Sequence, residues 1–368
     1  MRRICQIVCF VLLLALMGSG VALSVRPVTP PPKETLLSDL KKVNVTDLGE
    51  HTKDVGNACF SRDGRLVATG CYDGKVRVFD LATGKILHAF EFGDDGDNSP
   101  DKLGVRTQGL QEGVAFDHEG KRLVAVGGWF DPPVALATVF DLTTKKPLFT
   151  SRSHYGMVHG GAFSGDGSLV ITAGHDSTLK VLDAATGKEQ GTFKGHDWVV
   201  TAVTFSPDGK SVASVCCNTK KRSIRVWDPV TLKESQNIPL PDRITSLNDL
   251  RFSPDGKQIA GVSNWRLHVW EVATGKSLVN AEMDAGLFKR LAYSPDGKRI
   301  AVAGGQGGGD GKGILRVYDF ATDKVQLVFV EAEVGKESLA ISWPVAEKIL
   351  LIGARGKSAK LAVVELNK

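Results

Sequence analysis

The sequence predicts an all-β protein built from seven repeated units. Glycine accounts for 41 of the 368 residues without a collagen-like period, and there are only 15 prolines, which favours many tight turns between short strands. An aromatic residue followed by a Ser-x-Asp-Gly turn recurs along the chain. About twenty residues after each turn, an alternating β-type run ends in a hydrophobic residue and an acid. These observations together predict the fold class.

The two repeated signals fix the number of units. The turn occurs at Phe60–Gly64, Phe163–Gly167, Phe205–Gly209, Phe252–Gly256 and Tyr293–Gly297, with a degenerate copy at Phe116–Gly120. The closing pairs are Phe79-Asp80, Phe140-Asp141, Leu182-Asp183, Trp227-Asp228, Trp270-Glu271, Tyr318-Asp319 and Val364-Glu365. Their acids are spaced by 61, 42, 45, 43, 48 and 46 residues, close to the period of about 40–45 that is typical of a four-stranded propeller blade. Seven closures therefore predict a seven-bladed β-propeller.

Over roughly residues 43–366 the sequence resembles the WD-repeat β-propeller family. The closest individual matches are the dipeptides Trp227-Asp228 and Gly195-His196. In that family a histidine precedes the aspartate of the turn by 12 residues, and this spacing recurs between His51 and Asp63, His154 and Asp166, and His196 and Asp208. The match is divergent, and the export signal described below makes it bacterial-like, because WD-repeat proteins of eukaryotes are mostly intracellular.

The resemblance implies a buried structural network of His, Ser or Thr, Asp and Trp in each blade. The matching residues are His51, Thr69 and Asp73 in the first unit, His154, Thr172 and Asp176 in the third, and His196, Ser214 and Trp227 in the fourth. Phe79 and Leu182 replace the tryptophan, and Asn218 stands near the place of the fourth unit's aspartate. We therefore expect a structural role for the histidines, in blades that depend more on apolar packing than on polar networks.

The ends of the propeller are expected to close on each other. The last unit stops at residues 361–366, which leaves no room for a fourth strand, while residues 43–48 precede His51 as a fourth strand would. Because an open sheet edge is a liability, we expect the N-terminal strand 43–48 to pair antiparallel with the C-terminal strand 361–366.

The N-terminal region predicts export. Residues 1–24 have a basic start, an apolar stretch of 11 residues and small residues after it, as in a secretory signal peptide. The stretch is too short to cross a membrane, which takes about 20 residues, although an uncleaved anchor stays an alternative. Residues 25–42 form a proline-rich linker before the propeller at 43–368. We expect a secreted or periplasmic protein with no membrane span after cleavage.

Binding residues are expected on one face of the ring. The large insertions, at 91–112, 127–133, 217–223 and 304–313, all fall in connections that share one face, and loops on a rigid scaffold usually carry binding residues. Trp129 and Phe130 are flanked by prolines and predict an aromatic anchor, although they could instead cap their own blade. Further candidate contacts on this face are Tyr72, His175, Trp198, Trp265 and Phe288. The favoured function is a monomeric, non-catalytic scaffold that binds a protein or peptide.

The alternative is a small-ligand binder or an enzyme that uses the mouth of the central channel. It would need acidic, basic or histidine side chains to converge there, and the candidates at the strand starts are Asp54, His159, Lys289 and Arg290. Their mixed types suggest no catalytic set. We expect no catalytic residue and no enzyme activity.

Other chemistry lacks support. The net charge is +5, or +3 without Arg2 and Arg3, so there is no electrostatic basis for a nucleic-acid partner. The glycine-rich run at 304–313 does not follow the phosphate-loop pattern, and Pro100 stands where a calcium loop after Asp95 would need glycine. We expect neither a metal nor another cofactor, and free thiols at Cys59, Cys71, Cys216 and Cys217.

Overall fold

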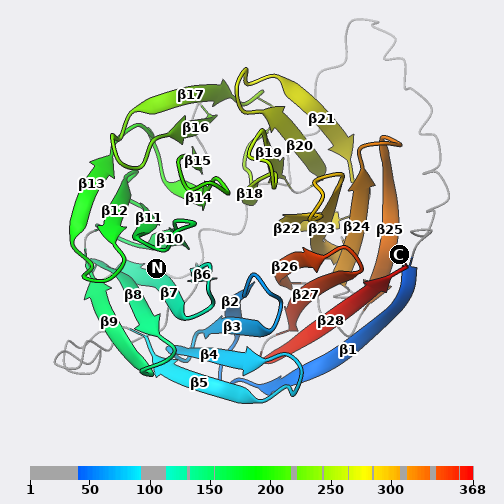
Figure 1. The fold of residues 1–368 in the computed structure, drawn as a ribbon, viewed down its shortest axis with the longest axis horizontal. Coiled ribbons are helices and arrows are strands. Elements are labelled where there is room, and N and C mark those ends of the chain that lie inside the picture. Colours follow the sequence, from blue (N-terminus) through cyan, green and yellow to red (C-terminus); the bar gives the residue numbers. More distant parts are fainter. Residues whose placement is uncertain are drawn as a thin grey trace, which may run out of the picture. The chain divides into compact units, whose positions relative to one another are not determined.

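Seven antiparallel four-stranded sheets surround a central channel in the computed structural model (Figure 1). The structure describes residues 40–367 except 93–112, 131–132, 153, 217–221, 243, 264, 284–285, 307–312, 332–336 and 356. All described residues belong to one compact unit, Glu34–Lys368. The prediction of a seven-bladed β-propeller is confirmed.

Each blade has its first strand at the channel and its fourth at the rim. Blade 1 holds β2 (Val55–Phe60), β3 (Leu66–Cys71), β4 (Lys75–Asp80) and β5 (Ile86–Glu91). Blade 2 holds β6 (Gly113–Phe116), β7 (Arg122–Phe130), β8 (Pro133–Asp141) and β9 (Lys146–Ser151). Blade 3 holds β10 (Val158–Phe163), β11 (Leu169–Gly174), β12 (Leu179–Asp183) and β13 (Glu189–Phe193).

The remaining blades follow the same order. Blade 4 holds β14 (Val200–Phe205), β15 (Val212–Cys216), β16 (Ser223–Trp227) and β17 (Glu234–Pro239). Blade 5 holds β18 (Asp249–Phe252), β19 (Gln258–Val262), β20 (Arg266–Glu271) and β21 (Ser277–Glu282). Blade 6 holds β22 (Gly286–Tyr293), β23 (Arg299–Gln306), β24 (Gly313–Asp319) and β25 (Lys324–Glu331). Blade 7 holds β26 (Glu337–Val345), β27 (Lys348–Arg355), β28 (Ser358–Leu366) and β1 (Leu40–Glu50).

The two ends of the propeller pair as expected. Strand β1 runs antiparallel to β28, with Val43 opposite Val364 and Val45 opposite Ala362. Strand β1 begins at Leu40, three residues before the start predicted from the sequence. Blade 7 therefore combines three C-terminal strands with one N-terminal strand.

The repeated turn motif is explained by its hydrogen bonds. Ser61 Oγ donates to Asp63 Oδ1 at 2.7 Å and accepts from Leu66 N at 2.9 Å, while Gly64 N donates to Ser61 O at 3.0 Å. Gly64 has a φ of 67°, a backbone conformation that favours glycine. The serine, the aspartate and the glycine thus each satisfy one requirement of the same tight turn.

The acids that close the first six units cap the next turn. Asp80 Oδ1 accepts from Thr83 N at 2.8 Å, and Asp183 Oδ1 accepts from Thr186 N at 2.8 Å. These turns join the third strand of a blade to its fourth, and they lie on the same face of the ring as the Asp-Gly turns. We call this the bottom face, and we call the face with the connections between second and third strands and between successive blades the top face.

The core consists of apolar clusters between neighbouring blades. The middle strands are buried along nearly their whole length, and every residue of β15 is buried. Each cluster joins two adjacent sheets; for example, Val78 of blade 1 packs with Leu123 and Phe140 of blade 2. Among the described residues there are seven such clusters, one at each junction of the ring. The expectation that the blades depend mainly on apolar packing agrees with this arrangement.

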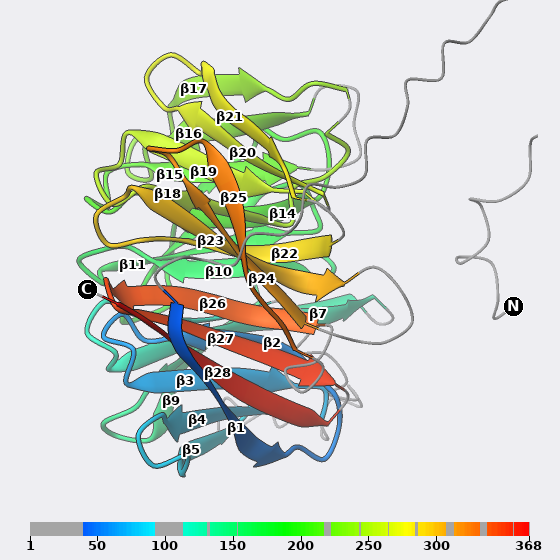
Figure 2. The same cartoon turned by 90° about the vertical axis from the view of Figure 1, so that its right-hand side faces the viewer.

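Two of the expected top-face loops contain continuations of strands. Within 127–133, β7 extends to Phe130 and β8 begins at Pro133, so the two strands form a long hairpin that projects from the ring in the side view of Figure 2. Within 304–313, β23 extends to Gln306 and β24 begins at Gly313. The expected insertion at 91–112 lies outside the described residues from 93 onward.

The structure describes three of the cysteines. Cys59 and Cys71 are free thiols and Cys216 is buried, while Cys217 lies outside the described residues. Cys59 lies opposite Ala68 rather than Cys71 in the β2–β3 hairpin.

Candidate functional site

The histidine, threonine and aspartate of the expected network all make contact in blade 3, where Leu182 replaces the tryptophan. His154 Nδ1 lies 3.0 Å from Asp176 Oδ1, and His154 Nε2 lies 2.8 Å from Thr172 Oγ1. Burial alone would raise the pKa of Asp176, but hydrogen bonds from His154 and Thr178 outweigh it and hold the pKa well below its usual range. These contacts tie the connection from blade 2 to the second and third strands of blade 3, which is a structural role.

Blade 1 departs from the expected network. His51 Nε2 lies 3.0 Å from Thr69 Oγ1, but Asp73 does not reach His51. Asp73 instead accepts from Thr52 Oγ1 at 2.6 Å and from Arg77 Nη2 at 2.7 Å. The carboxylate of Asp73, which the resemblance pairs with His51, therefore binds the guanidinium of Arg77 instead.

Blade 4 has the expected tryptophan. His196 Nε2 lies 2.8 Å from Ser214 Oγ, which also accepts from Trp227 Nε1 at 3.3 Å. Asn218 lies outside the described residues, and His196 Nδ1 has no hydrogen-bond partner among the described ones. Burial, assisted by the charge of Arg225, lowers the pKa of His196 to about 3.

The neutral His196 predicts a loss of stability in acid. In the unfolded chain this imidazole takes up a proton below about pH 6.5, whereas in the folded protein it stays neutral down to about pH 3, so folding opposes protonation between these values. We expect the neutral His196 to lower the free energy of unfolding by about 2–3 kcal/mol as the pH falls from 6.5 to 4.5. Urea unfolding of the wild type and of His196→Gln, followed by tryptophan fluorescence at both pH values, measures this difference.

The matched control for His196 is an exposed histidine. His118→Gln removes a side chain on the bottom face and should leave the pH dependence of the wild type unchanged. If His196→Gln lost as much stability between pH 6.5 and 4.5 as the wild type does, the loss could not be assigned to His196.

Exposed aromatic side chains gather on the top face. Trp198 lies in the connection between blades 3 and 4 and is 49% exposed, and Trp265 lies between β19 and β20 and is 57% exposed. His175 is also exposed, and its Nδ1 lies 3.1 Å from His159 Nε2. Tyr72 is half-buried. The structure therefore places four of the predicted contact residues at the top face.

The other three predicted contact residues are placed differently or not described. Phe288 is fully buried in the apolar cluster between blades 5 and 6, so its expected position on the surface is corrected. Trp129 and Phe130 lie at the end of β7, opposite Val134 and Pro133. The structure describes their backbone but not their side chains.

Tyr155 is a top-face aromatic residue that the sequence reasoning missed. It is 73% exposed and directly follows His154 of the histidine network. Its backbone N donates to Asp176 Oδ2 at 3.1 Å, which fixes the position of the residue at the top of blade 3. The repeat carried the signal, because Trp198 lies two residues after His196 in the corresponding connection to blade 4, close to the place of Tyr155 after His154.

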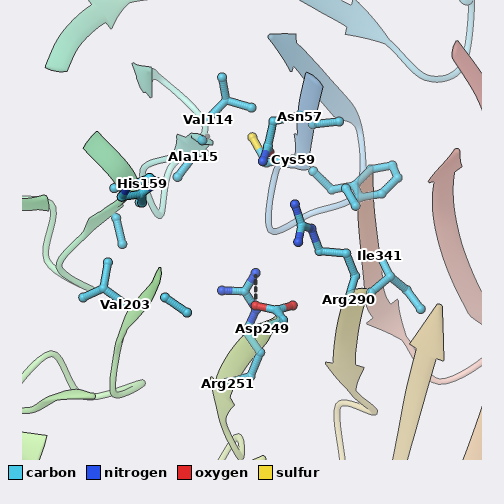
Figure 3. A pocket seen from close by; sticks show the side chains of 18 of the residues that line it. Asn57, Cys59, Val114, Ala115, His159, Val203, Asp249, Arg251, Arg290 and Ile341 are labelled. Carbon is cyan, nitrogen blue, oxygen red and sulfur yellow. Dashed lines mark ion pairs between the residues drawn. The ribbon is translucent and has the colours of Figure 1, made fainter. Parts of the chain in front are cut away.

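The innermost strands of all seven blades line a cavity of about 330 Å³ in the channel (Figure 3). Of the four strand-start candidates for channel chemistry, His159 and Arg290 line it, whereas Asp54 and Lys289 do not. Asp249 and Arg251 of blade 5 line it as well, with Arg251 Nη2 3.3 Å from Asp249 Oδ1. The set of four candidates does not converge.

The cavity offers little for catalysis. Burial raises the pKa of the Cys59 thiol in the wall to about 12, and the neutral thiol is a poor nucleophile. Among the residues that the structure describes, no group of three or more His, Cys, Asp or Glu side chains could hold a metal ion. The described part of the channel wall presents the guanidinium groups of Arg251 and Arg290, the carboxylate of Asp249 and several polar side chains.

Comparison with known proteins identifies the repeats. The family model of the WD domain, G-beta repeat, matches residues 42–80, 145–183 and 187–228. The chain contains WD40 repeats. Each match begins at or just before the fourth strand of one blade and ends at or just after the third strand of the next, as β1 followed by β2–β4 illustrates. The repeat in the sequence therefore starts one strand earlier than the blade in the structure. For this reason the first strand of the propeller, β1, completes the last blade.

The curated relatives that the chain matches are longer proteins. The chain is 25% identical over 66% of its length to human WD repeat and HMG-box DNA-binding protein 1, of which it covers 18%. It is 27% identical over 48% of its length to nuclear distribution protein PAC1 of Coccidioides posadasii, of which it covers 41%. It is 24% identical over 68% of its length to the periodic tryptophan protein 2 homolog of Dictyostelium discoideum, of which it covers 25%. The chain thus spans less than half of each relative, and none of the three names is that of an enzyme.

The described residues include no helix long and apolar enough to cross a membrane.

Proposed function

We propose that this chain is a non-catalytic scaffold that binds a protein or peptide through the top face of its propeller. The observation that carries the proposal is the exposure of three large aromatic side chains, Tyr155, Trp198 and Trp265, on that one face. Tyrosine and tryptophan dominate the binding energy of protein interfaces, because they bury a large area at a low cost in conformational entropy.

The rigidity of the ring supports this role. Tyr155 and Trp198 each lie within two residues of a histidine that is hydrogen-bonded to the second strand of its blade, Thr172 in blade 3 and Ser214 in blade 4. A partner would therefore meet aromatic groups held by a preformed scaffold, which reduces the entropy lost on binding. We also propose that residues 1–24 direct export and are removed, and that the chain acts as a monomer in the periplasm or outside the cell.

Replacing the three aromatic residues should remove the partner. The variant Tyr155→Ser/Trp198→Ser/Trp265→Ser, used as bait in the exported fraction of its source cells, should recover the wild type's specific partner at least about tenfold less well. Quantitative mass spectrometry of cross-linked captures measures the loss. A second variant, Trp129→Ala/Phe130→Ala, tests the aromatic pair at the tip of the β7–β8 hairpin.

The matched control replaces three exposed apolar residues with serine at the rim of the ring, away from the top face. Ile86, Leu148 and Leu278 lie on the fourth strands of blades 1, 2 and 5 and are exposed, so Ile86→Ser/Leu148→Ser/Leu278→Ser should recover the partner as the wild type does. Equal recovery by the top-face variants and the wild type, with native circular dichroism for all, would contradict the proposal.

A further inference from the structure

The channel cavity has an unusual distribution of charge. Among the described residues that line it, the charged ones are Asp249, Arg251 and Arg290. Burial keeps Cys59 a neutral thiol, and the other described lining residues are apolar or polar, with one histidine, His159. Among the described residues of the wall, the guanidinium groups therefore outnumber the carboxylates by two to one.

The single carboxylate is turned toward the protein. Asp249 is buried, and its Oδ2 accepts from Leu291 N of the neighbouring blade at 3.1 Å. Its Oδ1 accepts from Leu250 N at 2.9 Å and lies 3.3 Å from Arg251 Nη2. Asp249 therefore stabilises the junction of blades 5 and 6 and is engaged by backbone groups as well as by Arg251.

The two arginines come from neighbouring blades and face the same space. Arg251 is the third residue of β18, and Arg290 lies in the middle of β22. Both guanidinium groups extend into the cavity in Figure 3. A guanidinium is planar and always charged, and its parallel N–H groups match the two oxygens of a carboxylate or a phosphate.

Small residues in the other blades make room for a ligand. The position before the aromatic residue of the turn motif, which is Arg251 in blade 5, is occupied by Cys59, Ala115 and Ala162 in blades 1 to 3. Polar groups, among them those of Asn57, His159 and Thr201, line the wall as well. A volume of about 330 Å³ is at the lower end of the range of small-molecule sites, about 300–1,000 Å³.

We propose that the channel cavity binds a small polyvalent oxoanion, a carboxylate or a phosphate compound, between Arg251 and Arg290. The low-dielectric wall of the channel strengthens the attraction between these guanidinium groups and an anion relative to that in open water. The site is separate from the aromatic top-face contacts, and it requires no catalysis.

Isothermal titration calorimetry of the full chain with citrate, inorganic phosphate and pyrophosphate tests this site. The wild type should bind at least one of the three with a Kd below about 1 mM, and Arg251→Gln/Arg290→Gln should weaken binding at least about tenfold. Binding of citrate alone would identify a carboxylate ligand, and binding of the phosphates alone would identify a phosphate ligand. Both results support an oxoanion site.

Two further variants separate the loss of the anion site from the loss of positive charge and from misfolding. Lys257→Gln/Lys289→Gln removes the same charge from exposed residues that do not line the cavity, and it should bind as the wild type does. Arg290→Gln alone leaves the Asp249–Arg251 ion pair intact and should weaken binding several-fold, which keeps the test valid if the double variant does not fold. The proposal is overturned if the wild type binds none of the three anions, or if Arg290→Gln binds them as tightly as the lysine control.

Discussion

Removal of residues 40–50 is expected to leave the ring open and the protein aggregated. Strand β1 is the fourth strand of blade 7, and its loss would expose the unpaired N–H and C=O groups of β28. It would also remove Leu48 from the cluster between blades 7 and 1, and Val43 and Val45 from the cluster between blades 6 and 7. Size-exclusion chromatography should show aggregates in place of the monomer.

Point substitutions in β1 test the same closure in a full-length chain. Val43 and Val45 face the apolar cluster, and Val43→Asp/Val45→Asp would place two carboxylates against it. Because an unpaired charge in an apolar site is costly, we expect the free energy of unfolding to fall by on the order of 4 kcal/mol, measured by urea denaturation.

The neighbouring Thr46 provides the control. Thr46 is exposed in the same strand, opposite Leu361, so Thr46→Asp should change the free energy of unfolding by about 0.5 kcal/mol or less. The expectation for the truncated chain has a clear contrary outcome. If the chain without residues 40–50 eluted as a monomer with native tryptophan emission, the ring would close without β1.

The repeat made the fold accessible from sequence, because each of its residues satisfies a local requirement. Ser61, Asp63 and Gly64 form a turn by short-range hydrogen bonds, and Asp80 caps the turn that follows its own strand. Such contacts lie within a few residues, so they appear as a spacing in the sequence. Counting them was enough to predict seven blades and the pairing of residues 43–48 with 361–366.

The orientation of side chains near the channel could not be predicted in the same way. Strand β22 has a bulge between Phe288 and Arg290, which shifts the alternation so that Phe288 enters the core while Arg290 lines the channel. Gly304 on the partner strand permits the close approach, since a Cβ there would lie 2.3 Å from the carbonyl oxygen of Leu287. One bulge therefore turns an expected surface residue into a core residue.

The candidate site depends on contacts between segments far apart in the chain. Asp73 is at the expected position of the network, yet Arg77 competes with His51 for its carboxylate. Arg251 was overlooked, although it stands where the first three blades have small residues, and its meeting with Arg290 depends on the packing of two blades. Spacing within a repeat contains no information about such contacts between repeats.

Trp227→Ala is expected to be among the most destabilising single substitutions in the propeller. Trp227 is fully buried, its ring stacks on Phe193 with centroids 4.8 Å apart, and its Nε1 donates to Ser214 Oγ at 3.3 Å. Removal of a buried tryptophan leaves a large cavity, so we expect a loss of about 3–5 kcal/mol in the free energy of unfolding. Urea denaturation, followed by far-ultraviolet circular dichroism, measures this loss.

Two further tryptophan variants separate packing from hydrogen bonding. Trp227→Phe retains an aromatic ring, as blade 1 does with Phe79 at the corresponding position, and should cost only about 1–2 kcal/mol for the lost N–H and the smaller ring. Trp198→Ala, in the connection that leads into the same blade and 49% exposed, should change stability by about 0.5 kcal/mol or less. If Trp198→Ala were as destabilising as Trp227→Ala, the exposed aromatic residues would be part of the core, and the top face would lose its basis as a binding surface.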